Sequence, residues 1–541
     1  MARGRVKSLT AIFLLVVAFA DAAGAATTRI DEHGTTLVDG RKVFPIVLAK
    51  GPEGEGLDAV VAAGVKFLKI GPATRPWWPG DITDAIVRNR EAAARGVYTW
   101  VNLATLSDAD PESLKETRIR DVITALEEDP SASALALWKG ADEPWWADFP
   151  PAELQFAYCI ATSRGPADWC AGRPVADSEH LWVTIQAPRG TAAELAPYSA
   201  VTDIHGIDHY PVTFTNSDPD LHEVGTWTET IRSVTPNGAV WTTLQVCASG
   251  SSDPNDSSKF VLPTKLQERY MIYDAILNGA RSLAFYGGNL DRCWNDTDTA
   301  RGWNWTFWDT VLEDLVREIN DESPLASALV NPESTQTLES TDATTQVISR
   351  EGASESDLWV IAARHGEGTE PVTITGLPAG VRTGTVYTEG RAIDVTNGSF
   401  TDTFSRWDVH VYRFVIPPAP ASPAPPPPPP AEPPALPPVV TTVGPTALRS
   451  TSASSTRRGR LFSRRVGVVT NTGERVTSGT LSCGARVRRI PLRVVGQGWQ
   501  RGWAYCTWRV PKSLRGKLLR GVVRVDSRKL SLVHRFTARV R

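Results

Sequence analysis

Between residues 40 and 330, eight short apolar runs alternate with stretches that have the composition of helices. Runs of this length predict buried strands, and their alternation with helices predicts parallel strands joined by crossover connections. The expected strands are residues 43–50, 66–71, 97–103, 134–140, 181–187, 201–210, 239–247 and 281–287. Eight strand–helix units in about 290 residues are what a (β/α)8 TIM barrel requires, so we expect the α/β fold class.

A doubly wound parallel sheet is the alternative for such an alternation. That fold usually has a Gly-rich phosphate-binding turn after its first strand. Here the first expected strand is followed by Gly51-Pro52-Glu53-Gly54, which lacks that pattern. A barrel is therefore the preferred interpretation, with residues 26–330 as its domain.

The chain changes character after the barrel. Residues 331–416 contain short alternating strands and Gly-rich turns, which predict a small antiparallel β-sandwich docked on the barrel. From residue 417 to 438, 14 of 22 residues are proline, and such a stretch forms an extended, semi-rigid rod about 68 Å long. We place this proline-rich linker at residues 417–444 and expect a second all-β domain over residues 445–541.

The first 25 residues have the pattern of a secretory signal peptide. Arg3, Arg5 and Lys7 precede a short apolar run, and Ala23-Gly24-Ala25 fits a cleavage site. The run is too short to span a bilayer, and no later stretch reaches the ~18 apolar residues that a transmembrane helix needs. We therefore expect a secreted protein without a membrane span, with association with the cell wall as a further expectation.

Charge divides the chain into two bodies of opposite sign. Residues 445–541 hold 23 Lys and Arg against 2 Asp and Glu, a net charge of +21. The rest of the chain holds 34 basic against 58 acidic residues, a net charge of −24. A domain this basic attracts polyanions. On an exported chain we expect its partner to be an anionic cell-surface or wall polymer and not nucleic acid.

Six cysteines agree with an oxidising compartment. Their positions along the chain favour three disulfides, Cys159–Cys170, Cys247–Cys293 and Cys483–Cys506. A metal site is the rival interpretation. It is disfavoured because the chain has no CxxC spacing and most of its eight histidines are scattered, so we expect no metal and no cofactor.

Functional residues of such a barrel lie at the C-terminal ends of its strands. Asp142 and Glu143 end the fourth expected strand, Asp208 ends the sixth, and tryptophans surround these carboxylates. Aromatic faces flanked by carboxylates suit the apolar faces and hydroxyl edges of sugar rings. The alternative, that the tryptophans only cover the barrel, is less favoured because several lie in Pro-bounded loops. The expected substrate-binding residues are Trp77, Trp78, Trp100, Asn102, Trp145, Trp146, Gln186, His209, Tyr210, Gln245, Tyr286 and Trp294.

With these residues in place, the chain resembles a known group of enzymes over residues 40–416. The group is the large clan of secreted (β/α)8 retaining glycoside hydrolases whose acid/base glutamate follows Asn at the end of strand four. The clan's motif is Asn-Glu-Pro, and this chain has Asp142-Glu143-Pro144. Tyr210-Pro211, after strand six, is also similar to the clan. The resemblance implies that Glu143 is the general acid.

The chain departs from the clan at strand seven, where the clan has a nucleophilic glutamate. Gln245 stands where that carboxylate is expected, and an amide cannot form the glycosyl–enzyme ester. Three alternatives stay open. Asp208 could activate a water and give inversion, if it lies about 6.5–9.5 Å from Glu143. Gly140-Ala141-Asp142-Glu143 also resembles the hexosaminidases, in which the Asp orients the substrate's own acetamido nucleophile and the Glu is the acid. Thirdly, the barrel could bind carbohydrate without cleaving it.

The sequence thus predicts a secreted glycoside hydrolase that acts on an oligo- or polysaccharide. Glu143 is its expected general acid, and Asp142 and Asp208 are the other catalytic candidates. To donate a proton near neutrality Glu143 needs a raised pKa, and burial among tryptophans beside the charge of Asp142 acts in that direction. A catalytically inactive carbohydrate-binding or cell-wall-associated protein on the same barrel is the alternative function.

Overall fold

The structure is a computed structural model in which the chain forms two compact units, Met1–Ala421 and Ser422–Arg541. The described residues are 26–541, without residues 73, 166–169, 171–174, 178, 249–255, 418–447, 459–460, 472–473, 488–489, 501–502, 512–513, 515–516, 528–529 and 540–541. The expected signal peptide and nearly all of the expected linker therefore lie outside the described residues.

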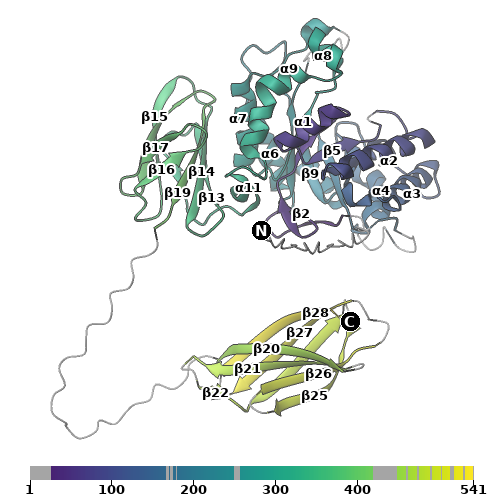
Figure 1. Ribbon diagram of the computed structural model, residues 1–541, viewed down its shortest axis with the longest axis vertical. Coiled ribbons are helices and arrows are strands. Elements are labelled where there is room, and N and C mark those ends of the chain that lie inside the picture. The colour runs from purple at the N-terminus through teal and green to yellow at the C-terminus, as the bar shows by residue number, and fades with distance from the viewer. Residues whose placement is uncertain are drawn as a thin grey trace, which may run out of the picture. The chain divides into compact units, whose positions relative to one another are not determined.

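Eight parallel strands close into a barrel in the first unit (Figure 1). Strand β11 pairs with β4, which completes the ring that the strands otherwise follow in chain order. The strands are β4 (Ile46–Leu48), β5 (Phe67–Ile70), β6 (Tyr98–Asn102), β7 (Leu135–Asp142), β8 (Leu181–Gln186), β9 (Ile204–Asp208), β10 (Val240–Gln245) and β11 (Leu283–Tyr286). Each overlaps one expected strand, so the predicted (β/α)8 barrel is confirmed.

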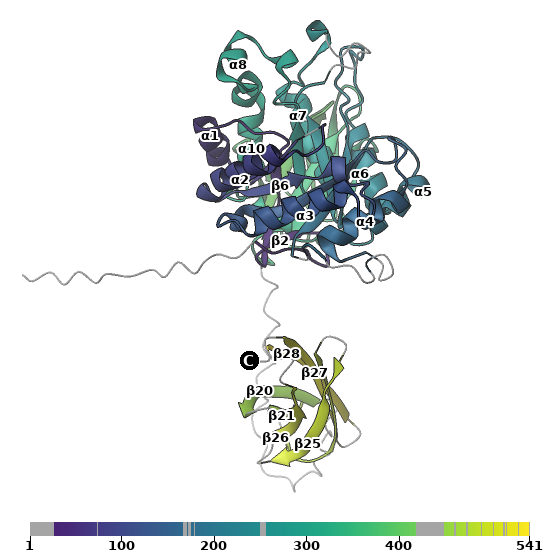
Figure 2. The ribbon, with the colours of Figure 1, turned by 90° about the vertical axis from the view of Figure 1, so that its right-hand side faces the viewer.

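Helices surround this barrel (Figure 2). They are α1 (Glu55–Ala63), α2 (Pro79–Ala94), α3 (Leu114–Glu127), α4 (Pro151–Thr162), α5 (Ala192–Leu195), α6 (Glu223–Ser233), α7 (Lys265–Leu277), α8 (Asp296–Arg301), α9 (Trp305–Phe307), α10 (Glu313–Ile319) and α11 (Ala326–Val330). Helix α7 begins with a capping box in which Thr264 and Gln267 bond each other's backbone N–H groups. Helix α1 ends at Gly64, whose φ of 115° and close approach to Asn320 leave no room for a side chain.

A three-stranded antiparallel sheet that the sequence analysis did not anticipate precedes the barrel. It consists of β1 (Thr28–Ile30), β2 (Thr36–Val38) and β3 (Arg41–Val43). Ala26 and Val38 pack in the same core as Val47 and Phe67 of the barrel interior. The sheet therefore closes the N-terminal end of the barrel and leaves the C-terminal end as its mouth.

Two antiparallel sheets follow the barrel and form the expected sandwich. One contains β12 (Glu339–Ser340), β15 (Thr369–Thr375) and β18 (Ser399–Ser405), and the other contains β13 (Thr345–Glu351), β14 (Asp357–Arg364), β19 (Val409–Val415), β16 (Thr383–Val386) and β17 (Arg391–Asp394). Strand β14 is buried on both faces. Leu358 and Val360 face the sandwich interior, whereas Trp359 and Ile361 join the core that holds Tyr273 of α7. Barrel and sandwich therefore share one core.

The second unit is an all-β sandwich of its own. One sheet contains β20 (Leu448–Arg458), β21 (Leu461–Thr470), β26 (Trp503–Arg509) and β25 (Arg493–Gln500), with β22 (Arg475–Val476) beside β21. The other contains β24 (Ile490–Pro491), β23 (Thr480–Val487), β27 (Leu518–Ser527) and β28 (Leu530–Arg539). Phe462, Trp508 and Phe536 pack between the sheets. This confirms the expected C-terminal all-β domain.

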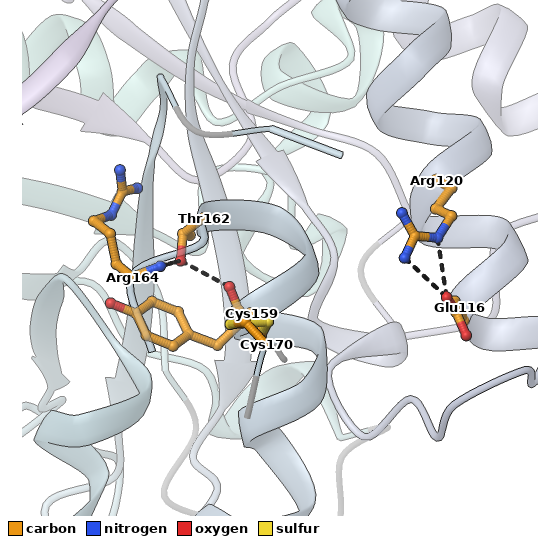
Figure 3. The surroundings of a disulfide bond; sticks show 7 residues. Glu116, Arg120, Cys159, Thr162, Arg164 and Cys170 are labelled. Atoms are coloured by element: carbon orange, nitrogen blue, oxygen red, sulfur yellow. Dashed lines mark hydrogen bonds and ion pairs between the residues drawn. A yellow bond between two sulfur atoms is a disulfide. The ribbon is translucent and has the colours of Figure 1, made fainter. Parts of the chain in front are cut away.

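All three expected disulfides are present: Cys159–Cys170, Cys247–Cys293 and Cys483–Cys506. Figure 3 shows the first of them at the end of α4, where the Arg164 backbone N–H donates to the Thr162 hydroxyl at 3.2 Å. The second ties the end of β10 to the loop after β11, and the third joins the two sheets of the second unit.

Among the helices of the described residues, none combines the length and the apolar composition required to cross a bilayer.

Candidate functional site

A bulge in β7 places the expected motif at the barrel mouth. Lys139 pairs with Val183 of β8, but the next paired residues are Asp142 and Ile185, so the register shifts between them. Gly140 lies in the bulge, where any Cβ would collide with the Trp182 indole. The bulge extends the strand two residues beyond its expected end.

Glu143 follows directly, in a backbone conformation that side chains rarely adopt. Its φ is 46°, and its N–H donates to the Ile185 carbonyl oxygen at 2.6 Å. A left-handed conformation at a residue other than glycine costs about 1–3 kcal/mol and persists only where the surroundings enforce it. Such strain gathers at functional sites, and here it falls on the expected general acid.

Glu143 and Asp208, hereafter the carboxyl pair, lie close enough together at the mouth for each to affect the pKa of the other. Asp208 ends β9 and is 9% exposed, and its Oδ2 accepts a hydrogen bond from the Tyr210 hydroxyl at 3.1 Å. Burial, and then the charge of Glu143, raises the pKa of Asp208 well above its ordinary value. Burial, and then the charge of Asp142, also raises the pKa of Glu143. Two neighbouring carboxyls of this kind titrate as a coupled pair.

Two lysines project into the same mouth. Lys139 Nζ lies 2.5 Å from Asp142 Oδ1. Although desolvation acts to raise the pKa of Asp142, the ammonium groups of Lys139 and Lys69 hold it below its ordinary value. Burial, and then the neighbouring Lys139, lowers the pKa of Lys69 to about 8. The sequence analysis did not include Lys69 in the expected site. Its side chain nevertheless points into the barrel as strand geometry predicts, because Lys69 lies two residues after Phe67 on β5 and so faces the same side.

Gln245, at the end of the seventh barrel strand, is fully buried and holds a loop in place. Its Oε1 accepts from the Val212 N–H at 3.1 Å, and its Nε2 donates to the Val212 carbonyl oxygen at 2.5 Å. Both halves of the amide are thus engaged with backbone. This corrects the expectation that Gln245 binds substrate.

Two of the expected aromatic residues are also packing groups. Trp77 is 3% exposed and donates its indole N–H to the Asn102 carbonyl oxygen at 2.8 Å. Trp100 lies in the barrel core, with its ring centroid 5.6 Å from that of Trp241. Neither ring presents a face to the mouth, which corrects the expectation that they stack on sugars.

The amides of Asn102 and Gln186 are buried as well and bond within the protein. Asn102 Nδ2 donates to the Pro72 carbonyl oxygen at 2.5 Å, and Gln186 Oε1 accepts from the Trp145 N–H at 3.3 Å. These two residues therefore shape the loops around the mouth and offer little to a ligand. His209, which is mostly buried, has its Nε2 3.0 Å from the Glu223 carboxylate.

The remaining expected aromatic residues do reach the surface. Trp78 and Trp146 are exposed, each with an arginine guanidinium over its ring. Trp145 and Trp294 are half-buried. Tyr210 and Tyr286 stack with their ring centroids 5.7 Å apart, beside the carboxyl pair. Flat ring faces therefore remain available on several sides of the mouth.

Two clefts adjoin these residues. One, of about 640 Å³, is lined by Lys69 and Tyr286 from the mouth and extends to Arg75 and Asp81 on the α2 side. The other, of about 600 Å³, is lined by Trp145, Trp146, Asp148, Pro150 and Tyr198. Clefts of this size accommodate small ligands.

A cluster with metal-ligand chemistry lies at the opposite end of the barrel, near the N-terminal ends of β7 and β8. Donor atoms of Glu127, Asp177 and His180 fall within 4.8 Å of one another. The Asp177 carboxylate is already engaged within the protein, since its Oδ2 lies 2.7 Å from His180 Nδ1 and 2.5 Å from the Trp138 indole nitrogen. Burial, and then the charge of Asp177, raises the pKa of Glu127 to about 8. Elsewhere in the described part of the chain no such grouping occurs.

Comparison with family models and with curated proteins found no match. Among solved structures, a GH30 endoxylanase from Clostridium papyrosolvens C71 is 11% identical, covers 70% of this chain and 97% of its own, and gives a TM-score of 0.39. An α-amylase from Geobacillus thermoleovorans is 11% identical, covers 68% of this chain and 98% of its own, and gives a TM-score of 0.40. A GH27 β-L-arabinopyranosidase from Geobacillus stearothermophilus is 10% identical, covers 70% of this chain and 98% of its own, and gives a TM-score of 0.42. At these identities the likeness concerns the fold alone.

Proposed function

We propose that this chain is an exported glycoside hydrolase in which the carboxyl pair cleaves a glycosidic bond of an oligo- or polysaccharide. The observation that carries the proposal is the proximity of Glu143 and Asp208 at the barrel mouth, with both pKa values raised. A pair that holds one proton supplies one acid and one base near neutral pH. These are the two protonation states that hydrolysis requires of its catalytic groups.

In the proposed reaction Glu143 is the general acid and Asp208 the general base. Water attacks the anomeric carbon while Asp208 takes a proton from that water, and Glu143 gives its proton to the leaving oxygen as the glycosidic bond breaks. The Tyr210 hydroxyl stabilises the Asp208 carboxylate, to which it already donates a hydrogen bond. Attack by water on the face opposite the leaving group inverts the anomeric configuration.

Inversion sets a requirement on the carboxyl pair, because inverting enzymes hold their carboxyls about 6.5–9.5 Å apart to admit a water. Glu143 is the partner that can move, because it is half-exposed, whereas Asp208 is buried and held by Tyr210. Binding of a sugar between the two carboxyls is therefore part of the proposal.

The experiment is a hydrolysis screen of oligo- and polysaccharides by reducing-sugar release, followed by NMR of the first anomer formed. Glu143→Gln and Asp208→Asn should each lower turnover by about 10²-fold or more, because each removes one proton-transfer group. Glu128→Gln is the matched control, since Glu128 is exposed at the C-terminal end of α3, which precedes the start of β7 and so lies away from the mouth. Unchanged turnover in Glu143→Gln, or a retained anomer, would refute the mechanism.

Binding without cleavage is the second candidate function. It is favoured by Gln245, which stands at the position of the clan's nucleophile and is engaged with the backbone of Val212. Here the wild-type protein should bind a saccharide measurably by calorimetry but release no reducing sugar over days. Glu143→Gln should then leave the binding affinity nearly unchanged.

A further inference from the structure

The second unit carries an arginine-rich outer face on one of its two sheets. Of the 23 basic residues in positions 445–541, 20 are arginine and 3 are lysine. Strand alternation directs Arg486, Arg520 and Arg535 outward from the sheet that contains β23, β27 and β28, while Phe536 faces the core. All three arginines are exposed.

Two of these arginines lie directly opposite each other. Arg486 of β23 pairs in register with Arg520 of β27, and Arg535 of β28 pairs with Val522 on the next outward row. Like charges opposite one another destabilise a sheet. No carboxylate forms an ion pair with any of the three among the described residues, and Asp526 of this sheet pairs instead with Arg524 at 3.5 Å. Their arrangement is therefore not explained by the stability of the sheet.

The three arginines surround a dish of about 730 Å³. Its floor includes Gly484 and Val522, which pair with each other across the sheet. A Cβ on Gly484 would lie 3.2 Å from Val522 Cγ1, so the missing side chain keeps the floor low. The dish thus combines a shallow concave floor with guanidinium groups from three strands.

We propose that this dish binds the tetrahedral oxyanions of an anionic surface polymer, either its phosphate groups or its sulfate esters. Guanidinium groups match such oxyanions with forked hydrogen bonds, which lysine cannot form. A tetrahedral group directs its oxygens out of one plane and can meet arginines that approach from three strands, whereas a carboxylate has two oxygens in one plane. Nucleic acid fits less well, because the one aromatic residue that lines the dish, Phe536, is buried and offers no ring face on which bases could stack.

This inference concerns the second unit and does not depend on the activity of the barrel. The test uses the full chain and measures binding to immobilised poly(glycerol phosphate) and to dextran sulfate at several salt concentrations. The two probes distinguish the phosphate source from the sulfate source. Polygalacturonate is the carboxylate probe of similar charge density and should bind about tenfold more weakly.

Arg486→Gln/Arg520→Gln is the principal variant. It should weaken binding about tenfold and lower the slope of log K against log salt by about two, one for each lost contact. Arg493→Gln/Arg509→Gln is the matched control, because these two arginines form another directly opposed, exposed pair on the other sheet. The control removes the same charge and should lose much less affinity.

Gly484→Leu tests the dish without changing charge. The leucine side chain should fill the floor and weaken binding, while the melting temperature of the variant shows whether the sheet still folds. Equal losses in the two double variants would overturn the proposal, since binding would then follow net charge alone. Tighter binding to duplex DNA than to poly(glycerol phosphate), or salt-sensitive self-association that accounts for the retention, would overturn it as well.

Discussion

Replacing Glu268 by methionine should stabilise the protein at neutral pH. Glu268 lies on α7, is fully buried, and accepts no hydrogen bond on either carboxyl oxygen within the described structure. Burial therefore raises its pKa well above the ordinary value of 4.5, so the folded chain holds a proton that the unfolded chain has lost. Methionine has a similar length and no charge to bury.

The size of the effect follows from the linkage between proton binding and folding. Because the folded-state pKa is raised, the stability from this group is fully present below pH 4.5 and declines as pH rises toward the folded-state pKa. The decline is about 1.36 kcal/mol for each pH unit over which only the folded chain holds the proton. Between pH 5 and pH 7 it amounts to at most about 2.7 kcal/mol, and the methionine variant should not show it.

The assay is urea unfolding followed by tryptophan fluorescence at pH 5, 6 and 7. The variant's advantage over the wild type should widen with pH, by at most about 2.7 kcal/mol from pH 5 to pH 7, since other titrating groups cancel in the difference. Glu268→Gln should remove the same pH dependence, but it should not add the stability that burying an apolar side chain gives. Glu229→Gln, at an exposed position on α6, should change neither the free energy of unfolding nor its pH dependence. A difference that is constant with pH would show that Glu268 is not protonated in the folded protein.

Three further predictions concern the mouth and its surroundings. Lys139→Met should raise both pKa values of the carboxyl pair, because the lysine lowers them now, and should shift the profile of kcat/KM to higher pH; an unmoved profile would contradict this. Gln245→Glu should destabilise the first unit by about 1–3 kcal/mol, measured by melting, since a carboxylate would face the Val212 carbonyl oxygen, and it should not create a retaining enzyme. Removing Cys247 and Cys293 together should cost about 3–4 kcal/mol in urea unfolding, because the disulfide spans 46 residues; an unchanged midpoint would show that the bond adds no stability.

Most of the barrel could be predicted because its strands are buried on both faces and read as apolar runs. The small sheet before the barrel was missed, since its strands have three residues each and no such run marks them. The end of β7 was placed two residues early because a bulge depends on contacts with β8. Pairing of strands, and not local composition, decides where such a strand ends.

The sequence predicted where the candidate residues lie in the barrel, but it did not predict which of the aromatic side chains are exposed. Strand order placed Asp142, Glu143 and Asp208 at one mouth, as the structure has them. A sequence does not show which ring of an adjacent pair faces solvent, so Trp77 and Trp78 were treated alike although one is buried and the other exposed. Lys69 could have been found from the sequence, because a lysine at an inward-facing position of an otherwise apolar barrel strand is unusual and indicates a functional role.

Strand β14, buried on both faces, has a consequence for how this protein can diversify. A genetic exchange that replaced the sandwich would expose the apolar surface of α7 on which Trp359 and Ile361 pack. The barrel would then carry an exposed apolar patch that favours aggregation. Barrel and sandwich must therefore descend together and accumulate compensating substitutions along their seam. The C-terminal unit has its own core and disulfide, so recombination could exchange it for another domain without disturbing the rest.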